Sequence, residues 1–230
     1  MSEKITTPDA RFSVRKYAPE DRSIVRKICA DTGFLGNPID PLFEDRELFA
    51  DYLTDYYLSE EPESSFILEV EGVIRGYLLG SRKAIAQKKY DQLHIPLLAV
   101  KGLWRYFTRP YHPATKKYVQ WILKNSRKEQ PLTPENTPHF HINLLADARK
   151  VGTTRALIDA YLQYLAQCGE KAVFGQMITY ESRRGERMFE RYGFKLIDKK
   201  KVSKFDGLSG EQVYLCTVLK NLDQGVKLYD

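Results

Sequence analysis

The chain has 230 residues, 43% of them hydrophobic and 12% aromatic, a composition that supports a sizeable core and excludes a disordered protein. Its 36 basic residues are interspersed with 30 acidic ones, so the net charge of +6 is typical of a solvated surface, and we do not expect nucleic acid as a partner. The longest purely apolar run, residues 95–100, is far shorter than the roughly 20 residues of a membrane span and the first residues contain no apolar signal segment, which predicts a soluble cytoplasmic protein without membrane contact.

The first third of the chain predicts a strand, two helices and a hairpin. We expect a strand at residues 12–18, then a helix at 19–34 that begins at a proline followed by acidic residues. A second helix is expected at 47–58, and residues 64–82 indicate a hairpin that turns at Glu71 and Gly72. Six apolar side chains of the second helix recur at helical spacing: Leu48, Phe49, Tyr52, Leu53, Tyr56 and Tyr57.

Residues 84–138 form a different region, rich in basic and aromatic side chains and closed by several prolines. We interpret it as a helical insertion followed by a loop. Its aromatic side chains are Trp104, Tyr106, Phe107, Tyr111, Tyr118 and Trp121. They are compatible with ordinary packing of accessory helices, with an acceptor pocket, with a homodimer face or with nucleic-acid contact.

The last part of the chain predicts a strand at 139–145, a helix at 152–168 and a strand at 171–178. This βαβ order makes the two strands parallel. A short helix within 181–192, ending at Gly193, and two final strands around the turn 206–210 complete a mixed α/β sheet.

Three cysteines, Cys29, Cys168 and Cys216, occur without CxxC spacing or a neighbouring histidine cluster. We therefore expect reduced thiols, with neither a disulfide framework nor a metal site.

The stretch RKVGTT, residues 149–154, follows the predicted strand at 139–145 and opens the helix after it. Free amides and the positive end of the dipole at a helix start attract an anion, Gly152 allows close approach, and Arg149, Lys150 and Arg155 add charge. Taken alone, the same residues are explained better as a basic helix cap.

With its surroundings, the stretch resembles the Q/R-x-x-G-x-G/A motif of the GNAT superfamily of acetyl-CoA-dependent N-acetyltransferases. The segments FSVRKYAPEDRSIVRKI, FILEVEGVIRGYLLG and RMFERYGFK are also similar to that family, so that the resemblance spans most of the chain outside 84–138. It implies one GNAT domain over 1–230, with a strongly twisted mixed sheet of six to seven strands flanked by helices. The helical insertion would precede the fourth strand. The implied activity is acetyl transfer from acetyl-CoA, as cosubstrate, to an amine of a small molecule or a protein by direct attack.

In the family, the fourth and fifth strands splay apart and the pantetheine arm of acetyl-CoA pairs with the fourth strand. The resemblance therefore implies that backbone near Leu144 and Leu145 holds the thioester, with an N–H, assigned to Leu145, stabilising the oxyanion. Ser182 stands where the family often has a cofactor-contacting asparagine, and as a helix N-cap it needs no cofactor. The implied cofactor-binding residues are Leu144, Leu145, Arg149, Lys150, Val151, Gly152, Thr153, Thr154, Ser182 and Phe189.

Two positions depart from the family pattern. Thr154 replaces a small residue, so that its side chain either hinders a phosphate or donates to it. Phe189 replaces the tyrosine that commonly protonates the departing sulfur, and Tyr192 or Tyr180 is then a substitute acid or a packed aromatic residue. A catalytically impaired acyl-CoA sensor is therefore the alternative function.

A general base is required because an amine of pKa near 10 is mostly protonated at neutral pH. The alternation of the strand at 139–145 puts His139, His141 and Asn143 on one face, and His141 is our first candidate for the base. Asp147, just after the strand, and Glu69, on the hairpin, are weaker candidates.

Overall fold

The computed structural model describes residues 12–182 and 186–222. The strands are β1 (Phe12–Lys16), β2 (Ser65–Val70), β3 (Val73–Ser81), β4 (His139–Leu144), β5 (Ala172–Tyr180), β6 (Lys195–Lys201) and β7 (Val213–Asn221). The α-helices are α1 (Arg22–Thr32), α2 (Arg46–Ser59), α3 (Ala84–Thr108), α4 (Pro113–Lys124), α5 (Val151–Gln167) and α6 (Glu186–Arg191). Short 3-10 turns include η3 (Ala146–Ala148) and η4 (Ser203–Phe205). Within these residues, no helix has the length and apolar character needed to cross a membrane.

The seven strands form one sheet in the order β1-β2-β3-β4-β5-β7-β6. Neighbouring strands are antiparallel except for β4 and β5, which are parallel, as the βαβ order predicted. The expected mixed sheet of six to seven strands, with a helical segment before the fourth strand, is therefore confirmed.

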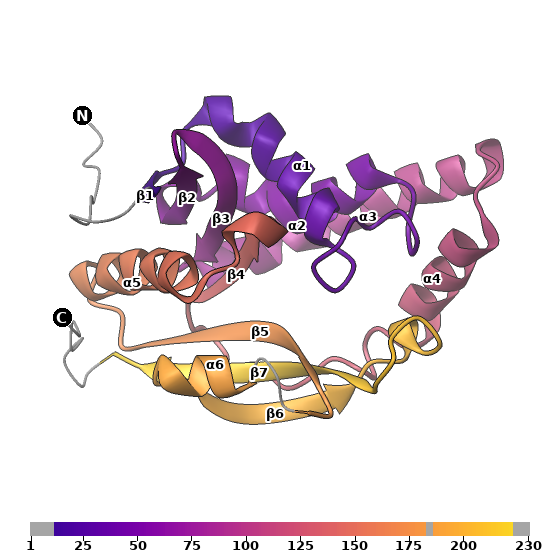
Figure 1. Cartoon of the computed structure of the whole chain (residues 1–230). Coiled ribbons are helices and arrows are strands. Elements are labelled where there is room, and N and C mark those ends of the chain that lie inside the picture. The colour runs from indigo at the N-terminus through magenta and orange to yellow at the C-terminus, as the bar shows by residue number, and fades with distance from the viewer. Residues whose placement is uncertain (1–11, 183–185, 223–230) are drawn as a thin grey trace.

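Helices cover both faces of this sheet (Figure 1). On one face, α1 and α2 bury a core with β2 and β3 that contains Val25, Ile28, Phe49 and Tyr57. On the other face, α5 and α6 bury the second core, whose largest side chains are Phe66, Phe140, Tyr161, Phe189 and Phe194.

Local sequence explains the first helices and the hairpin. The carboxylate of Asp45 caps α2 by accepting from the amide of Leu48 at 3.1 Å. At the hairpin turn, Glu71 and Gly72 have φ values of 52° and 78°, which a glycine adopts without strain. Of the six apolar side chains at helical spacing in α2, Tyr52 is 64% exposed.

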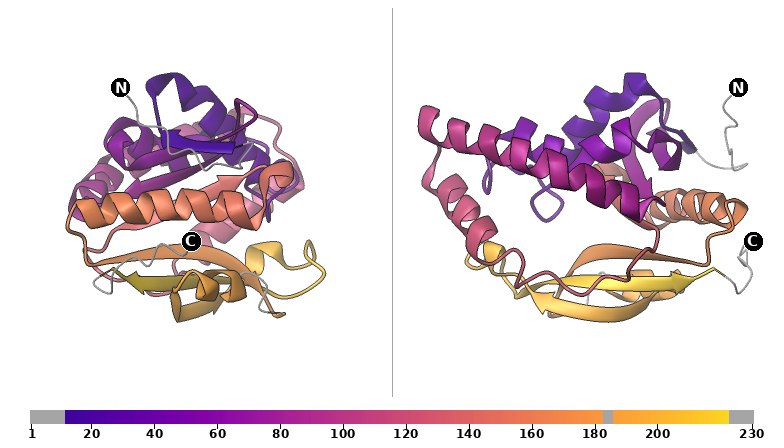
Figure 2. Two further views of the ribbon diagram at one scale, coloured as in Figure 1. Left: turned by 60° about the vertical axis from the view of Figure 1, so that its left-hand side comes forward. Right: turned by 180° about the vertical axis from the view of Figure 1, so that it is seen from behind.

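The 84–138 segment is helical, as predicted, and crosses the molecule. Its first helix, α3, lies along α2, and α4 then descends toward the connection between β6 and β7 (Figures 1 and 2). The carboxylate of Glu129, just after α4, accepts from the indole of Trp121 at 2.7 Å and from the amide of Ser203 in η4 at 2.8 Å. We call residues 84–138 the strap, because they connect the α1–α2 side to the β6–β7 end.

Candidate functional site

The two parallel strands at the centre of the sheet separate. The pairing of β4 with β5 comprises His139 with Phe174 and Phe140 with Gly175, and it ends there. Beyond Phe140, β4 continues along β3, whereas β5 continues along β7. The strands therefore diverge toward their carboxyl ends, as the family resemblance implied.

The register of β4 with β3 determines which backbone groups point into this gap. The amide of Leu145 donates to the carbonyl of Arg75 at 2.9 Å, so that odd-numbered residues of β4 bond to β3. The N–H and C=O groups of Ile142 and Leu144 consequently point toward β5, where no β5 residue pairs with them. The assignment of the oxyanion donor to Leu145 was wrong, because its amide is already bonded to β3.

The loop that follows β4 brings a helix start to the open end of the gap. The amide of Thr154 bonds to the carbonyl of Lys150 at 3.1 Å and begins the helical ladder of α5. Within the described residues, the amides of Val151, Gly152 and Thr153 have no hydrogen-bond acceptor. Three free donors and the positive end of a 17-residue helix thus meet at one point.

Gly152 leaves this helix start open. A Cβ atom added there would meet only the ring of Phe12, at 4.0 Å. Packing therefore does not require a glycine at this position, whereas close approach of a ligand would.

The loop is fixed by the guanidinium of Arg149. This group donates to the carbonyl of Leu144 at 2.8 Å and also to the carbonyl of Gly36, in the α1–α2 loop. Two of its donors are thus occupied by backbone, so Arg149 holds the loop in place as well as adding positive charge.

The opposite face of β4 carries two neutral histidines. The Nε2 atom of His139 lies 2.9 Å from the hydroxyl of Tyr57, and burial together with neighbouring His141 lowers the pKa of His139 to about 3. Burial lowers the pKa of His141 to about 4, and its imidazole has no hydrogen-bond partner among the described residues. Asn143 donates to the hydroxyl of Thr32 at 2.5 Å. Tyr57 was missed by sequence reasoning, because it lies 82 positions before His139 on another element.

The two carboxylates proposed as alternative bases differ in position. Asp147 lies in η3, directly between β4 and α5, with a side chain that is 61% exposed and 3.6 Å from Arg75. Glu69 lies on β2 and accepts from Arg15 at 2.7 Å and from Ser13 at 3.4 Å, so that it belongs to an ion pair at the β1 edge of the sheet.

Several solved structures share this fold. The crystal structure of SsHAT is 28% identical in sequence, with a TM-score of 0.65 over 91% of this chain and 98% of that one. An agmatine N-acetyltransferase is 14% identical, with a TM-score of 0.54 over 92% and 100% of the two chains. The structure of yncA from Salmonella typhimurium, with its cofactor acetyl-CoA, is 11% identical, with a TM-score of 0.51 over 94% and 96%.

The chain has the GNAT fold of N-acetyltransferases. No protein-family model and no curated protein matches the sequence.

The GNAT-like motif at 149–154 differs from the family at Thr154, and the structure shows where that side chain lies. Thr154 is buried against the rest of the chain, so its β-branch lies on the inner side of α5, away from the three free amides. The hydroxyl of Thr153 donates to the carbonyl of Ala148 at 2.6 Å and accepts from the amide of Lys150 at 3.2 Å. The side chain of Thr153 therefore stabilises the loop from within, whereas that of Thr154 is buried.

The aromatic residue at the position of the GNAT tyrosine is part of the core. Phe189 is buried and packs against Phe140 and Phe194, with ring centroids 6.5 and 5.5 Å apart. Tyr192 directs its hydroxyl to the carbonyl of Val151 at 3.3 Å, at the start of α5. Tyr180 packs partly buried on the α1–α2 face of the sheet.

Ser182 is the last described residue before α6. It lies in an exposed turn, four residues before the first residue of α6, and its carbonyl accepts from Arg187 at 3.1 Å. Residues 183–185 lie outside the described residues, so the expected N-cap role of Ser182 stays a prediction.

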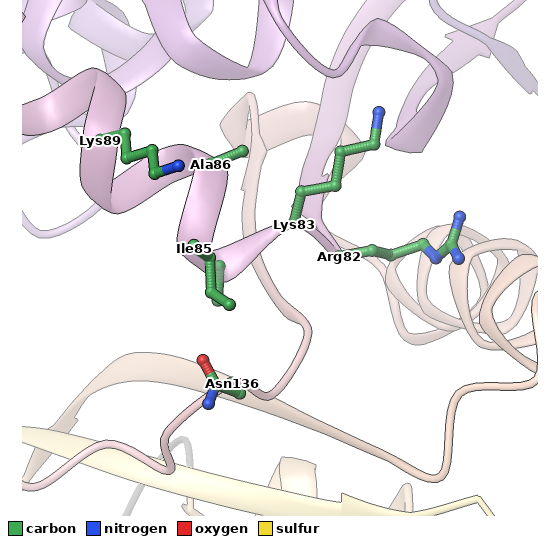
Figure 3. Close-up of a pocket in the computed structure, with 7 residues that line it drawn as sticks. Arg82, Lys83, Ile85, Ala86, Lys89 and Asn136 are labelled. Carbon is green, nitrogen blue, oxygen red and sulfur yellow. The ribbon is translucent and has the colours of Figure 1, made fainter.

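Two cavities lie at the other end of β4 from the GNAT motif. The first, of about 470 Å³, is lined by Arg82, Lys83, Lys89 and Asn136 among others (Figure 3). Arg82 and Lys83 are engaged by Glu170 and Glu63, at 3.0 and 2.6 Å, and their side chains point away from Asn136 (Figure 3). The second, of about 230 Å³, adjoins His139 on the histidine face of β4.

Proposed function

We propose that the protein is an acetyl-CoA-dependent N-acetyltransferase that transfers the acetyl group to an amine by direct attack. The observation that supports this most is the coincidence of two backbone features. The peptide groups of Ile142 and the amide of Leu144, with which no β5 residue pairs, face the gap beside β4, and the free amides of residues 151–153 lie at its open end. A diphosphate joined to an extended, amide-containing arm matches this arrangement.

Each part of acetyl-CoA has a matching group of the chain in this proposal. The diphosphate binds the amides of Val151, Gly152 and Thr153, with Lys150 adding charge. The pantetheine arm forms a pseudo-strand along β4, bonded to Ile142. The amide of Leu144 replaces that of Leu145 as the donor to the thioester oxygen, where it stabilises the negative charge that develops during attack.

His141 is the group that we assign to the amine. Because the lowered pKa keeps its imidazole neutral at physiological pH, a ring nitrogen accepts a hydrogen bond from the amine and directs the lone pair at the thioester. Direct proton transfer from a free ammonium of pKa near 10 to a group of pKa about 4 would cost roughly 8 kcal/mol. The amine therefore attacks as its neutral fraction, and the imidazole takes the proton of the newly bound nitrogen after attack, when that nitrogen has become more acidic. Asp147 remains the second candidate, since its exposed carboxylate follows β4 directly.

The departing sulfur requires no acid from the chain. The thiol of CoA, with a pKa near 8.5, leaves as thiolate at pH 7 for a penalty of roughly 2 kcal/mol. Phe189 is therefore compatible with turnover at a reduced rate.

Thermal unfolding with acetyl-CoA tests the binding part of the proposal. A ligand at 100 times its dissociation constant stabilises by about 2.7 kcal/mol, which corresponds to roughly 5–10 °C for a chain of this size. The absence of a shift at millimolar acetyl-CoA would refute the assignment.

Release of CoA thiol over a panel of polyamines, aminoglycosides, amino acids and basic peptides tests the chemistry. We expect turnover with at least one amine, reduced at least tenfold by His141→Gln with acetyl-CoA binding intact. Binding without turnover over the whole panel would instead favour an acyl-CoA sensor.

A further inference from the structure

The outward side of α3 carries an apolar stripe. It comprises Leu93, Leu97, Val100, Trp104 and Phe107, each between 65% and 77% exposed. In a helix of 25 residues that buries none of them fully, these five side chains follow one line along its solvent side. We call them the α3 stripe.

The opposite side of α3 is anchored to the body of the protein, which fixes the orientation of the stripe. Lys101 pairs with Asp51 and Arg105 with Asp45, both at 2.6 Å. A Cβ atom at Gly102 would lie 3.2 Å from Leu48, so α3 approaches α2 closely at that point. Figure 2 shows α3 along the outside of the molecule.

The stripe carries no charge of its own. Between Leu93 and Phe107, all of which the structure describes, the charged side chains are Lys101 and Arg105, and both are engaged by carboxylates of the body. His94 stacks on Tyr90 with ring centroids 3.6 Å apart. Burial of the stripe would therefore remove apolar surface from water with little loss of polar hydration.

The spacing of the stripe is nearly symmetric about its centre. Its residues follow one another at intervals of four, three, four and three, the heptad spacing of helices that pack on helices. Seen from Val100, the outer members lie seven residues away on either side. A two-fold axis at Val100 would thus pair Leu93 with the partner's Phe107 and Leu97 with the partner's Trp104, a smaller side chain facing a larger one in each case.

The area is sufficient for a stable contact. With neighbouring Leu103, which is 59% exposed, the stripe presents on the order of 800 Å² per chain, close to what each partner of a standard interface buries. A helix that lies on a membrane instead keeps free lysine and arginine beside its apolar face. Here Lys101 and Arg105 are committed to Asp51 and Asp45.

We propose that the α3 stripe is a homodimer interface, in which α3 of a second copy of this chain packs antiparallel across a two-fold axis near Val100. The interface is independent of the acetyl-CoA site, and its test requires no enzymatic activity.

Sedimentation equilibrium of the full chain tests the interface. We expect a dimer with a dissociation constant below about 10 μM. Val100→Glu places two carboxylates against each other at the axis and should weaken association at least 100-fold. Leu123→Glu, at an 80% exposed position of α4 outside the stripe, should leave it unchanged. A monomeric parent chain, or a Val100→Glu variant that still dimerises, would overturn the proposal.

Cross-linking with a short bis-maleimide tests the antiparallel geometry, in a Cys168→Ser background because that thiol is only half-buried. Val100→Cys should link to itself, and Leu93→Cys should link to Phe107→Cys when the two variants are mixed. Leu93→Cys linked to itself would contradict the antiparallel arrangement. If the chain is instead a monomer that sediments with phosphatidylglycerol vesicles, and a stripe variant does not, the α3 stripe is a membrane-binding surface and not a dimer interface.

Discussion

Position 152, in the first turn of α5, is a glycine although the surrounding residues leave space for a side chain. Gly152→Asp separates binding from folding, because a carboxylate at a helix start favours the helix by about 0.3–1 kcal/mol whereas it repels a diphosphate. We expect the variant to unfold at the same temperature as the parent or slightly above it, and to lose the shift caused by acetyl-CoA. Differential scanning fluorimetry measures both values.

Gly210→Asp is the matched control, since a Cβ atom at Gly210 also meets no neighbour within 4 Å, in a loop between β6 and β7. It should retain the full shift. A Gly152→Asp variant that still responds to acetyl-CoA would place the diphosphate elsewhere.

The two histidines of β4 make stability depend on pH. Their pKa values fall from about 6.5 in the unfolded chain to about 3 for His139 and about 4 for His141 in the folded protein. Between pH 6.5 and 4 the unfolded chain binds more protons, so the free energy of unfolding decreases as the pH falls through this window. At pH 5 we expect a loss of about 2 kcal/mol per histidine relative to pH 7.5, measured by urea denaturation.

The double variant His139→Phe, His141→Phe should lose most of this pH dependence, since other groups in the chain are unchanged. An equal dependence in both proteins would show that different residues cause it.

At the residue scale, strand alternation correctly predicted that His139, His141 and Asn143 share a face, because period two is a local property. The oxyanion donor could not be predicted in the same way. Whether Leu144 or Leu145 points into the gap depends on the register with β3, which residues 60 to 70 positions earlier determine.

Among the elements, β4 pairs with β3 along its whole length but with β5 only at His139 and Phe140, and hydrogen exchange can detect this difference. The amides of Asn143 and Leu145 are protected by β3 in the free protein, whereas those of Ile142 and Leu144 face the gap. We expect acetyl-CoA to slow exchange at Ile142 and Leu144 at least tenfold and to leave Asn143 nearly unchanged. NMR exchange rates with and without acetyl-CoA would measure this, and a uniform change along β4 would contradict the pseudo-strand.

Element types were predicted more reliably than element boundaries. Amphipathic periodicity and glycine turns correctly predicted α1, α2, the β2–β3 hairpin and the βαβ unit. Each of these signals is local, because it is contained in a stretch of about 20 residues. The path of the strap was not accessible, because Glu129 and Ser203, which fix the end of the strap, are 74 residues apart in sequence.

In the whole molecule, the strap complements a weak connection between the two halves of the sheet. Only two residue pairs join β4 to β5, whereas Glu129 accepts from Trp121 and from both the amide and the hydroxyl of Ser203. Glu129→Ala removes these bonds, and we expect a loss of about 1–3 kcal/mol, or roughly 2–12 °C in melting temperature. The affinity for acetyl-CoA should remain within twofold, as measured by calorimetry.

Glu135→Ala, at an exposed position of the same segment, is the comparison and should melt like the parent. If both variants melt alike, the strap does not stabilise the molecule through Glu129.

The gap between β4 and β5 is made by divergence of two backbones and not by the removal of side chains. Its donors and acceptors are peptide groups, which every amino acid except proline supplies in full. Mutations in β4 can therefore change the side chains on the face that meets the amine, while the backbone edge of free peptide groups persists. Such a site is compatible with the sequence divergence observed here, in which a shared fold survives at 11–28% identity. Acceptor specificity can then change under selection without any change in the groups that lie along the gap.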